Sequence, residues 1–160
     1  MRFMVLDSAK AEKREANPEA AKTKEYEQYD LNKDIGDGDT WTGEPFLTEI
    51  YENDWGLSGN LYISNHENKE RLRGRVKVKN KEDNVSFWQK SLGFSLVKSI
   101  KELNGETISD EINVFTVSYK ELREYLNGLD EITVGVVNHT ADINGEPTNW
   151  NTLDIVNIGD

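Results

Sequence analysis

The chain has 160 residues, a length that suits one domain and is too short for two ordinary ones. Its 30 acidic and 19 basic residues give a formal net charge of −11, which disfavours general adhesion to nucleic acid or to anionic membranes. The absence of cysteine excludes disulfides, thiolate nucleophiles and Cys-ligated metal sites. Leu, Ile, Val and Phe together make up about 24% of the residues, which is enough to predict a folded domain.

The N-terminal half carries mainly strand signals. Residues 2–6 are predicted as a short strand, and Asn17-Pro18 predicts the start of a helix that runs from Pro18 to about Gln28. A Gly/Asp cluster at residues 34–39 is predicted as a loop. Three strands are then expected, at residues 46–51, 56–63 and 71–79. We expect a single domain over residues 1–160, of which residues 1–16 could be loosely attached.

The clearest helix is expected at residues 85–103, where apolar residues recur every three or four positions. Ser118 followed by Glu121 is a capping box, which predicts a short helix that ends at Gly128. The remaining apolar runs predict strands at residues 112–117, 132–137 and 153–158, the last two as a hairpin with a long polar loop. The expected fold class is α+β, an antiparallel sheet packed by one main amphipathic helix at 85–103 with additional shorter helices.

The apolar runs are too short for a membrane span, and the N-terminal run at residues 3–6 is far shorter than the core of a signal peptide. We therefore expect a cytoplasmic protein with no membrane partner.

One segment carries a regular row of cations. Period-two alternation over residues 71–81 places them all on one face of a strand. These cations are Arg71, Arg73, Arg75, Lys77, Lys79 and Lys81. They could form a track for the phosphates of a nucleic acid, or a solvated face whose cations pair with carboxylates across strands. The second interpretation is favoured because no aromatic residues are interleaved with the cations as stacking platforms.

A calcium-loop pattern begins at Asp30 but does not continue. Glycine stands at the seventh position instead of the sixth, and Trp41 occupies the twelfth position, where a bidentate glutamate belongs. An EF-hand is therefore not expected. A looser cation site at Asp34, Asp37 and Asp39 stays open as an alternative to ordinary turn chemistry. No metal and no cofactor is predicted.

Catalytic signatures are missing from the sequence. His66 and His139 are the two side chains that could titrate near neutral pH without a shifted pKa, and neither belongs to a known catalytic motif. The phosphate-binding glycine loop, the serine elbow and the zinc-binding helix motif are all absent from the sequence. We therefore expect a protein that is not an enzyme.

An acidic-aromatic block, residues 25–54, is the strongest candidate for an interaction surface. It holds ten acidic residues and one lysine, a net charge of −9, interspersed with aromatic residues. Spaced carboxylates can imitate the phosphates of a nucleic acid, and aromatic side chains can anchor an interface. The predicted partner-binding residues are Asp37, Asp39, Glu44, Glu49, Glu52 and Asp54. The alternative is that the acids keep the domain soluble and the aromatics belong to its core.

A small, acidic, cysteine-free domain with an acidic-aromatic block beside a basic strand resembles the anti-CRISPR proteins of phages and mobile elements. The resemblance rests on the general character of the chain and on no diagnostic motif. It implies an inhibitor in a bacterial host cell that binds a basic nucleic-acid-processing enzyme, with a type II CRISPR effector nuclease as the candidate partner. The alternative function is a nucleic-acid-binding protein that uses the basic strand 71–81, which we rank below the inhibitor.

Overall fold

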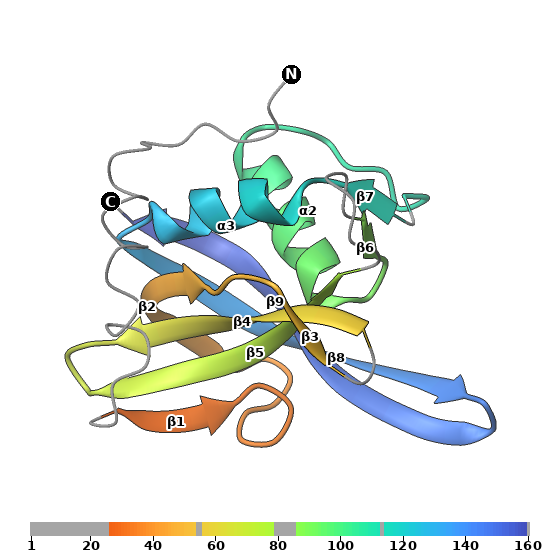
Figure 1. The fold of residues 1–160 in the computed structure, drawn as a ribbon, viewed down its shortest axis with the longest axis horizontal. Helices are drawn as coiled ribbons and strands as arrows, with labels where there is room; N and C mark the ends of the chain where they lie inside the picture. The colour runs from red at the N-terminus through yellow and green to blue at the C-terminus, as the bar shows by residue number, and fades with distance from the viewer. Residues whose placement is uncertain (1–25, 54–55, 79–85, 113, 160) are drawn as a thin grey trace.

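The structure, a computed structural model, describes residues 26–53, 56–78, 86–112 and 114–159. Its main element is one curled sheet with the strand order β1-β5-β4-β2-β8-β9, to which β3 adds beside β4 (Figure 1). The strands are β1 (Glu27–Asp30), β2 (Thr40–Leu47), β3 (Tyr51–Asn53), β4 (Gly56–Asn65), β5 (Glu70–Val78), β8 (Glu131–Ile143) and β9 (Glu146–Gly159). A small separate sheet pairs β6 (Ser86–Trp88) with β7 (Val114–Thr116).

Strand β2 makes the sheet curl because its two halves pair with different neighbours. Residues 40–43 pair with β8, and residues 44–47 pair with β4. At the change of partner stands Gly43, where an added Cβ would lie 2.5 Å from the carbonyl oxygen of Ser64. Only glycine allows this close approach of the two strands. The curl leaves β5 and β9 at its two sides, both running in the same direction as β2.

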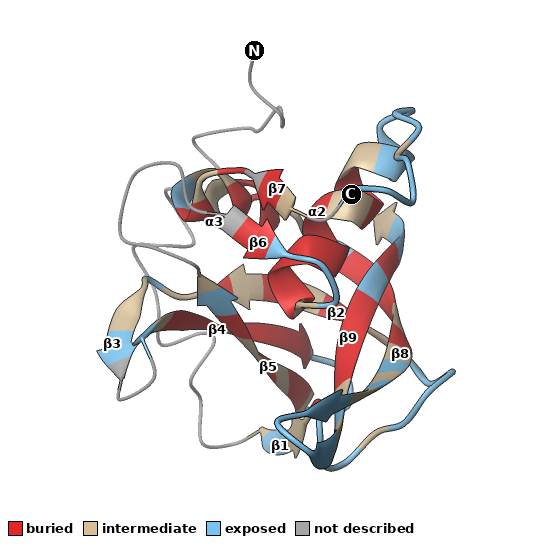
Figure 2. Ribbon diagram, turned by 90° about the vertical axis from the view of Figure 1, so that its right-hand side faces the viewer, coloured by how far each residue is buried: buried red, intermediate tan, exposed pale blue. Residues whose placement is uncertain are grey.

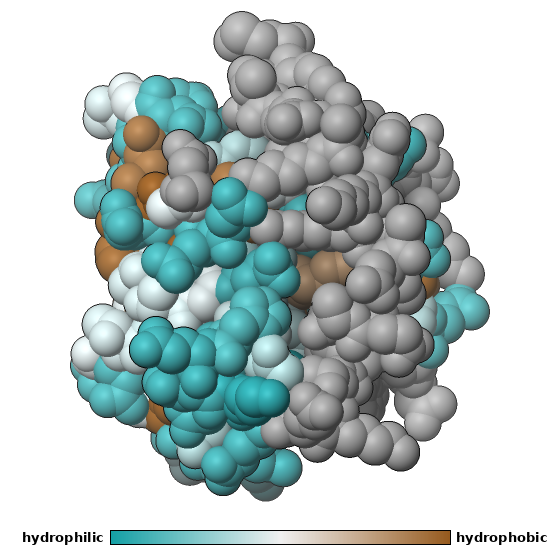
Figure 3. All heavy atoms as spheres, turned by 90° about the vertical axis from the view of Figure 1, so that its left-hand side faces the viewer, coloured by the Kyte–Doolittle hydropathy of each residue, from teal (hydrophilic) through white to brown (hydrophobic). Residues whose placement is uncertain are grey.

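Two helices cover the inside of this curl. The helix α2 (Leu92–Leu103) packs mainly against β9 and β5, and α3 (Tyr119–Asn127) packs against β2. Fully buried aliphatic side chains of both helices and of the inner sheet face form the core, which runs through the centre of the molecule in Figure 2. They include Leu47, Leu61, Ile63, Leu72, Leu96, Ile100, Leu122 and Ile132. The face on the left of Figure 1 is largely hydrophilic where its residues are described (Figure 3).

The α+β class is confirmed, but the expected arrangement of one main helix on an antiparallel sheet is not. The sheet is mixed because β1 pairs with β5 in parallel, and α3 shares the packing with α2. The expected helix at 85–103 begins seven residues later, at Leu92. Ser91 is its N-cap, with the hydroxyl accepting a hydrogen bond from the Phe94 N–H at 3.1 Å, and residues 86–88 form β6.

Several predicted elements occur where they are expected. Strands β4 and β5 match the predictions at 56–63 and 71–79, and β7 lies within 112–117. The capping box is confirmed, since the Ser118 hydroxyl accepts a hydrogen bond from the Glu121 N–H at 3.1 Å and α3 ends before Gly128. The strand expected at 46–51 is displaced, because β2 already starts at Thr40 and ends at Leu47.

The terminal hairpin differs from the prediction in its connection. In place of a long polar loop, β8 and β9 continue to a two-residue turn at Asn144 and Gly145. Both residues have positive φ, 54° and 82°, as a two-residue type I′ turn of a β-hairpin requires. The predicted helix end is also wrong, because Gln28 lies in β1. The strand at 2–6, the order of residues 1–16 and the helix start at Pro18 lie outside the described residues.

Among the described residues, the helices are all too short or too polar to cross a membrane.

We predict that Gly59→Ala strongly destabilises the fold and that Tyr119→Phe partly rescues it. An added Cβ at Gly59 would lie 1.6 Å from the Tyr119 hydroxyl oxygen, which is buried and donates a hydrogen bond to the Thr48 carbonyl at 2.7 Å. The clash should cost about 2 kcal/mol or more in chemical denaturation. Tyr119→Phe alone should cost about 1 kcal/mol and should lessen the effect of Gly59→Ala in the double variant. If the double variant loses as much stability as the two single variants together, the close contact between Gly59 and Tyr119 is contradicted.

Candidate functional site

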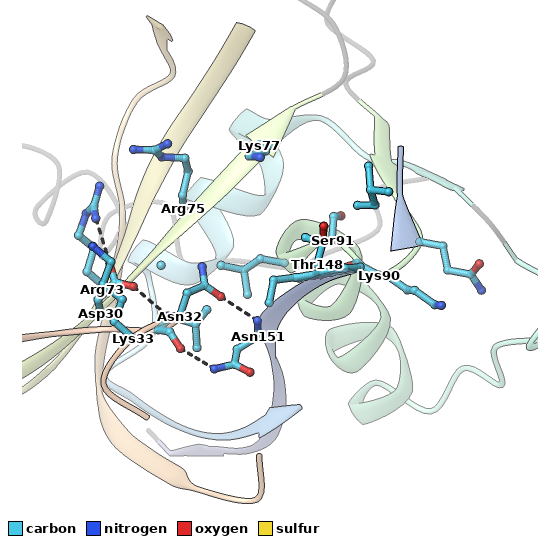
Figure 4. A pocket seen from close by; sticks show the side chains of 16 residues that line it. Asp30, Asn32, Lys33, Arg73, Arg75, Lys77, Lys90, Ser91, Thr148 and Asn151 are labelled. Carbon is cyan, nitrogen blue, oxygen red and sulfur yellow. Dashed lines mark hydrogen bonds and ion pairs between the residues drawn. The ribbon is translucent and has the colours of Figure 1, made fainter. Parts of the chain in front are cut away.

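An open pocket of about 590 Å³ lies between β5 and β9, at the start of α2 (Figure 4). Its wall is completed by the turn that follows β1 and by the tip of the β8–β9 hairpin. The lining holds five cationic side chains, Lys33, Arg73, Arg75, Lys77 and Lys90, and one carboxylate, that of Asp30. The lining therefore carries a formal charge of +4 in a chain whose total is −11.

Three of these cations come from separate segments of the chain. Lys33 lies in the turn after β1, Lys77 near the end of β5, and Lys90 in the turn before α2, and all three are exposed. Like charges gathered at one opening repel one another and raise its positive potential. The pocket is therefore suited to an anionic ligand.

The predicted period-two row is confirmed for β5. The register places Arg71, Arg73 and Arg75 opposite Ser64, Tyr62 and Asn60 on the outer face of the sheet.

Exposure changes along this row, from Arg71, which is 9% exposed, to Lys77, which is exposed. The guanidinium carbon of Arg71 lies 4.7 Å from the centroid of the Tyr62 ring. Arg73 forms an ion pair with Asp30, with 3.5 Å between Nη1 and Oδ2. The cross-strand pairing expected for such a face is thus present at Arg73. Lys79 and Lys81 lie outside the described residues.

A buried asparagine fixes the side of the pocket formed by β9. The Asn151 side-chain amide donates hydrogen bonds to the carbonyls of Leu31, at 2.7 Å, and Ile35, at 3.1 Å. Its backbone N–H donates to Oδ1 of Asn32 at 2.7 Å, and its own Oδ1 accepts from Asn138 at 2.9 Å. Because the chain passes directly from β1 into this turn and β1 pairs with β5, these bonds connect β9 to β5.

An aromatic pair stands on the hairpin side of the pocket. Trp150 lines the pocket and stacks on His139, with ring centroids 5.6 Å apart and an angle of 23° between the planes. The indole N–H donates to the Lys90 carbonyl at 2.7 Å, and His139 Nε2 is 2.8 Å from the Thr152 hydroxyl. Partial burial lowers the pKa of His139, and the nearby Lys90 charge lowers it further, so both effects favour the neutral imidazole.

The predicted partner-binding acids lie on several separate elements. Asp37 and Asp39 belong to the loop before β2, where their carboxylates accept hydrogen bonds from the N–H groups of Asn138 and Gly36. Glu44 lies on the outer face of β2, 3.1 Å from His66 Nε2. Glu49 follows β2 and forms an ion pair with Arg123 at 3.4 Å.

Glu52 is exposed on β3, and Asp54 lies outside the described residues. Of the six acids, Asp37 and Asp39 are neighbours in one loop, while Glu44, Glu49 and Glu52 belong to β2, to the segment after it and to β3.

The sequence leaves open a looser cation site at Asp34, Asp37 and Asp39, and in the structure these three carboxylates accept hydrogen bonds from the chain. Asp34 accepts a hydrogen bond from the Asp30 N–H at 2.7 Å, so this carboxylate, like those of Asp37 and Asp39, bonds to backbone N–H groups. Within the described residues, acids and histidines form no group of three or more that could hold a metal ion.

Comparison with protein-family models, with curated proteins and with solved structures gives no match for this chain.

We predict that His139 titrates below its ordinary pKa of 6.5 and that Lys90→Ala moves the value upward. Burial and a neighbouring positive charge both favour the neutral ring, and the variant removes the charge alone. An NMR titration of the imidazole signals measures both values. Because the unfolded chain takes up this proton first, the His139 contribution to stability should decline as the pH falls below about 6.5. A value above 6.5 would contradict the described environment.

Proposed function

We propose that this protein binds single-stranded nucleic acid, with the basic pocket and the adjoining outer face of β5 as its binding surface. The observation that carries the proposal is that Lys33, Lys77 and Lys90, which belong to three separate segments, all line one pocket. Phosphate neutralisation by lysine and arginine releases counterions and supplies most of the affinity for a nucleic-acid strand. Cationic side chains outnumber carboxylates in the pocket lining, so the pocket has the positive charge that phosphate binding needs.

The acidity of the rest of the chain is compatible with this function. At ordinary salt, charges more than about 10 Å from a nucleic-acid strand are largely screened. A basic opening can therefore attract the strand although the net charge of the protein is negative. Negative charge elsewhere repels phosphates from other parts of the surface. The acidic residues elsewhere on the surface would then confine binding to the pocket and the adjoining face.

The connectivity of the sheet supports the proposal by analogy. The five long strands follow one another in space as β5-β4-β2-β8-β9, with helices between β5 and β8. This connectivity resembles that of OB-folds, partly open five-stranded Greek-key barrels that bind oligonucleotides on the face of their second and third strands. The corresponding strands here are β4 and β5, and β5 carries the arginine row. The face used for binding in that fold therefore coincides with the basic face of this chain.

The inhibitor function suggested by the acidic-aromatic block has less support. Glu44 and Glu49 already interact with His66 and Arg123, and the exposed acids lie on separate elements. Binding to a basic nuclease through this block, as an anti-CRISPR protein would do, stays a prediction that binding assays can separate from nucleic-acid binding.

We predict that Lys33→Glu with Lys77→Glu weakens binding to a labelled single strand of about 16 nucleotides by roughly tenfold or more. Fluorescence anisotropy over a range of salt concentrations measures the affinity. The slope of log affinity against log salt should flatten by about 0.7 for each phosphate that the variant no longer neutralises. Circular dichroism confirms that the variant is folded.

The matched control is Lys120→Glu, compared with the single variant Lys77→Glu. Both change one exposed lysine to glutamate, but Lys120 lies on α3 and does not line the pocket. Equally weakened binding in the two variants would indicate a general effect of net charge and would contradict a binding site at the pocket. No measurable binding by the unaltered protein would overturn the proposed function itself.

A further inference from the structure

We infer that the pocket receives one unpaired base of the bound strand, which stacks against Trp150 while the neighbouring phosphates lie near Lys33, Lys77 and Lys90. This inference rests on the proposed function and adds to it the part of the ligand that the pocket recognises. A purely electrostatic surface would hold the sugar-phosphate backbone alone.

The indole of Trp150 is held in place before a ligand arrives. One ring face is stacked on His139, and the ring N–H is bonded to the Lys90 carbonyl. His139 does not line the pocket, so the part of the indole that does so is not the face covered by the imidazole. A fixed aromatic surface loses little conformational entropy when a base stacks on it, so the stacking strengthens binding.

The remaining lining suits a flat ring with polar edges. Leu31, Leu92 and Ile143 supply apolar surface, and Ile143 at the hairpin tip is 47% exposed. Asn32 is fixed through its Oδ1, which accepts from the Asn151 N–H, and Figure 4 shows its amide nitrogen directed into the pocket. The lining therefore offers a hydrogen-bond donor to a base edge beside the apolar surface.

Size and charge also fit one nucleotide of a strand. The volume of about 590 Å³ lies in the range of small-ligand pockets, about 300–1,000 Å³. The lysines stand around the opening on three segments, so phosphates on either side of an inserted base would meet positive charge. A base paired inside a duplex must first leave the stack, which costs free energy, so the pocket should select single strands.

The test compares an oligothymidylate with a strand of equal length in which every nucleotide is abasic. The unaltered protein should bind the thymidylate strand about tenfold more tightly, as expected from one stacked base. Equal affinity for the two strands would overturn the base pocket but would leave polyanion binding intact. Failure of both strands to bind would overturn the proposed function as well.

Variants at two tryptophans locate the effect. Trp150→Leu should remove the preference for the thymidylate strand, and Trp150→Phe should retain most of it. The control is Trp88→Leu, since Trp88 is 51% exposed on β6 but does not line the pocket. If Trp150→Leu is folded by circular dichroism and keeps the full preference, the base stacks elsewhere. If that variant does not fold, photo-crosslinking of a strand containing 5-iodouracil to the unaltered protein decides, because the crosslinked peptide must contain Trp150.

Discussion

The pocket depends on the hydrogen bonds of one buried side chain, Asn151. Its amide is bonded to the turn after β1, and its carbonyl oxygen is bonded to Asn138 on the neighbouring strand. Each of these groups would cost about 1–3 kcal/mol if it were buried without a partner, so the arrangement is strongly favoured over alternatives. Through these bonds β9 stays attached to the turn that leads out of β1, and β1 is paired with β5. These bonds, together with α2, which packs against both strands, hold β5 and β9 at the two sides of the opening.

This geometry explains how an acidic protein can present a basic site. The acidic residues of the described part of the chain are distributed over loops, helix surfaces and the outer face of β2, where several carboxylates are hydrogen-bonded or ion-paired. The cations that line the pocket come from segments far apart in the chain, and the curl of the sheet brings them together. Net charge describes the behaviour of the whole surface at long range, whereas binding in a cleft depends on the charges within about one Debye length.

Local signals in the sequence predicted the elements but not the site. The arginine row of β5 and the capping box at Ser118 were predictable because period-two alternation and N-capping involve only neighbouring residues. The sequence also contains Asn144-Gly145, a strong hairpin signal that the prediction of a long loop overlooked. The helix prediction began too early because the apolar spacing at residues 85–91 resembles a helix, while Ser91 provides the N-cap that starts it at Leu92.

The grouping of Lys33 and Lys90 with the row on β5 could not be predicted in this way. It follows from the change of partner along β2 and from the hydrogen bonds of Asn151. Both involve residues that are far apart in the sequence. For the same reason the sequence did not indicate that Trp150 lines the pocket, since its bond to the Lys90 carbonyl spans sixty positions of the chain. The sequence patterns assigned the arginine row to a solvated face and ranked it below the acidic-aromatic block.

The most direct test of a nucleic-acid site between β5 and β9 is hydrogen–deuterium exchange with and without a saturating single strand. Slower exchange is expected in the segments around the pocket, residues 31–33, 74–78, 89–92 and 148–151, with little change in α3. Protection confined to the loop and strands of the acidic-aromatic block, or no change anywhere, would contradict the account.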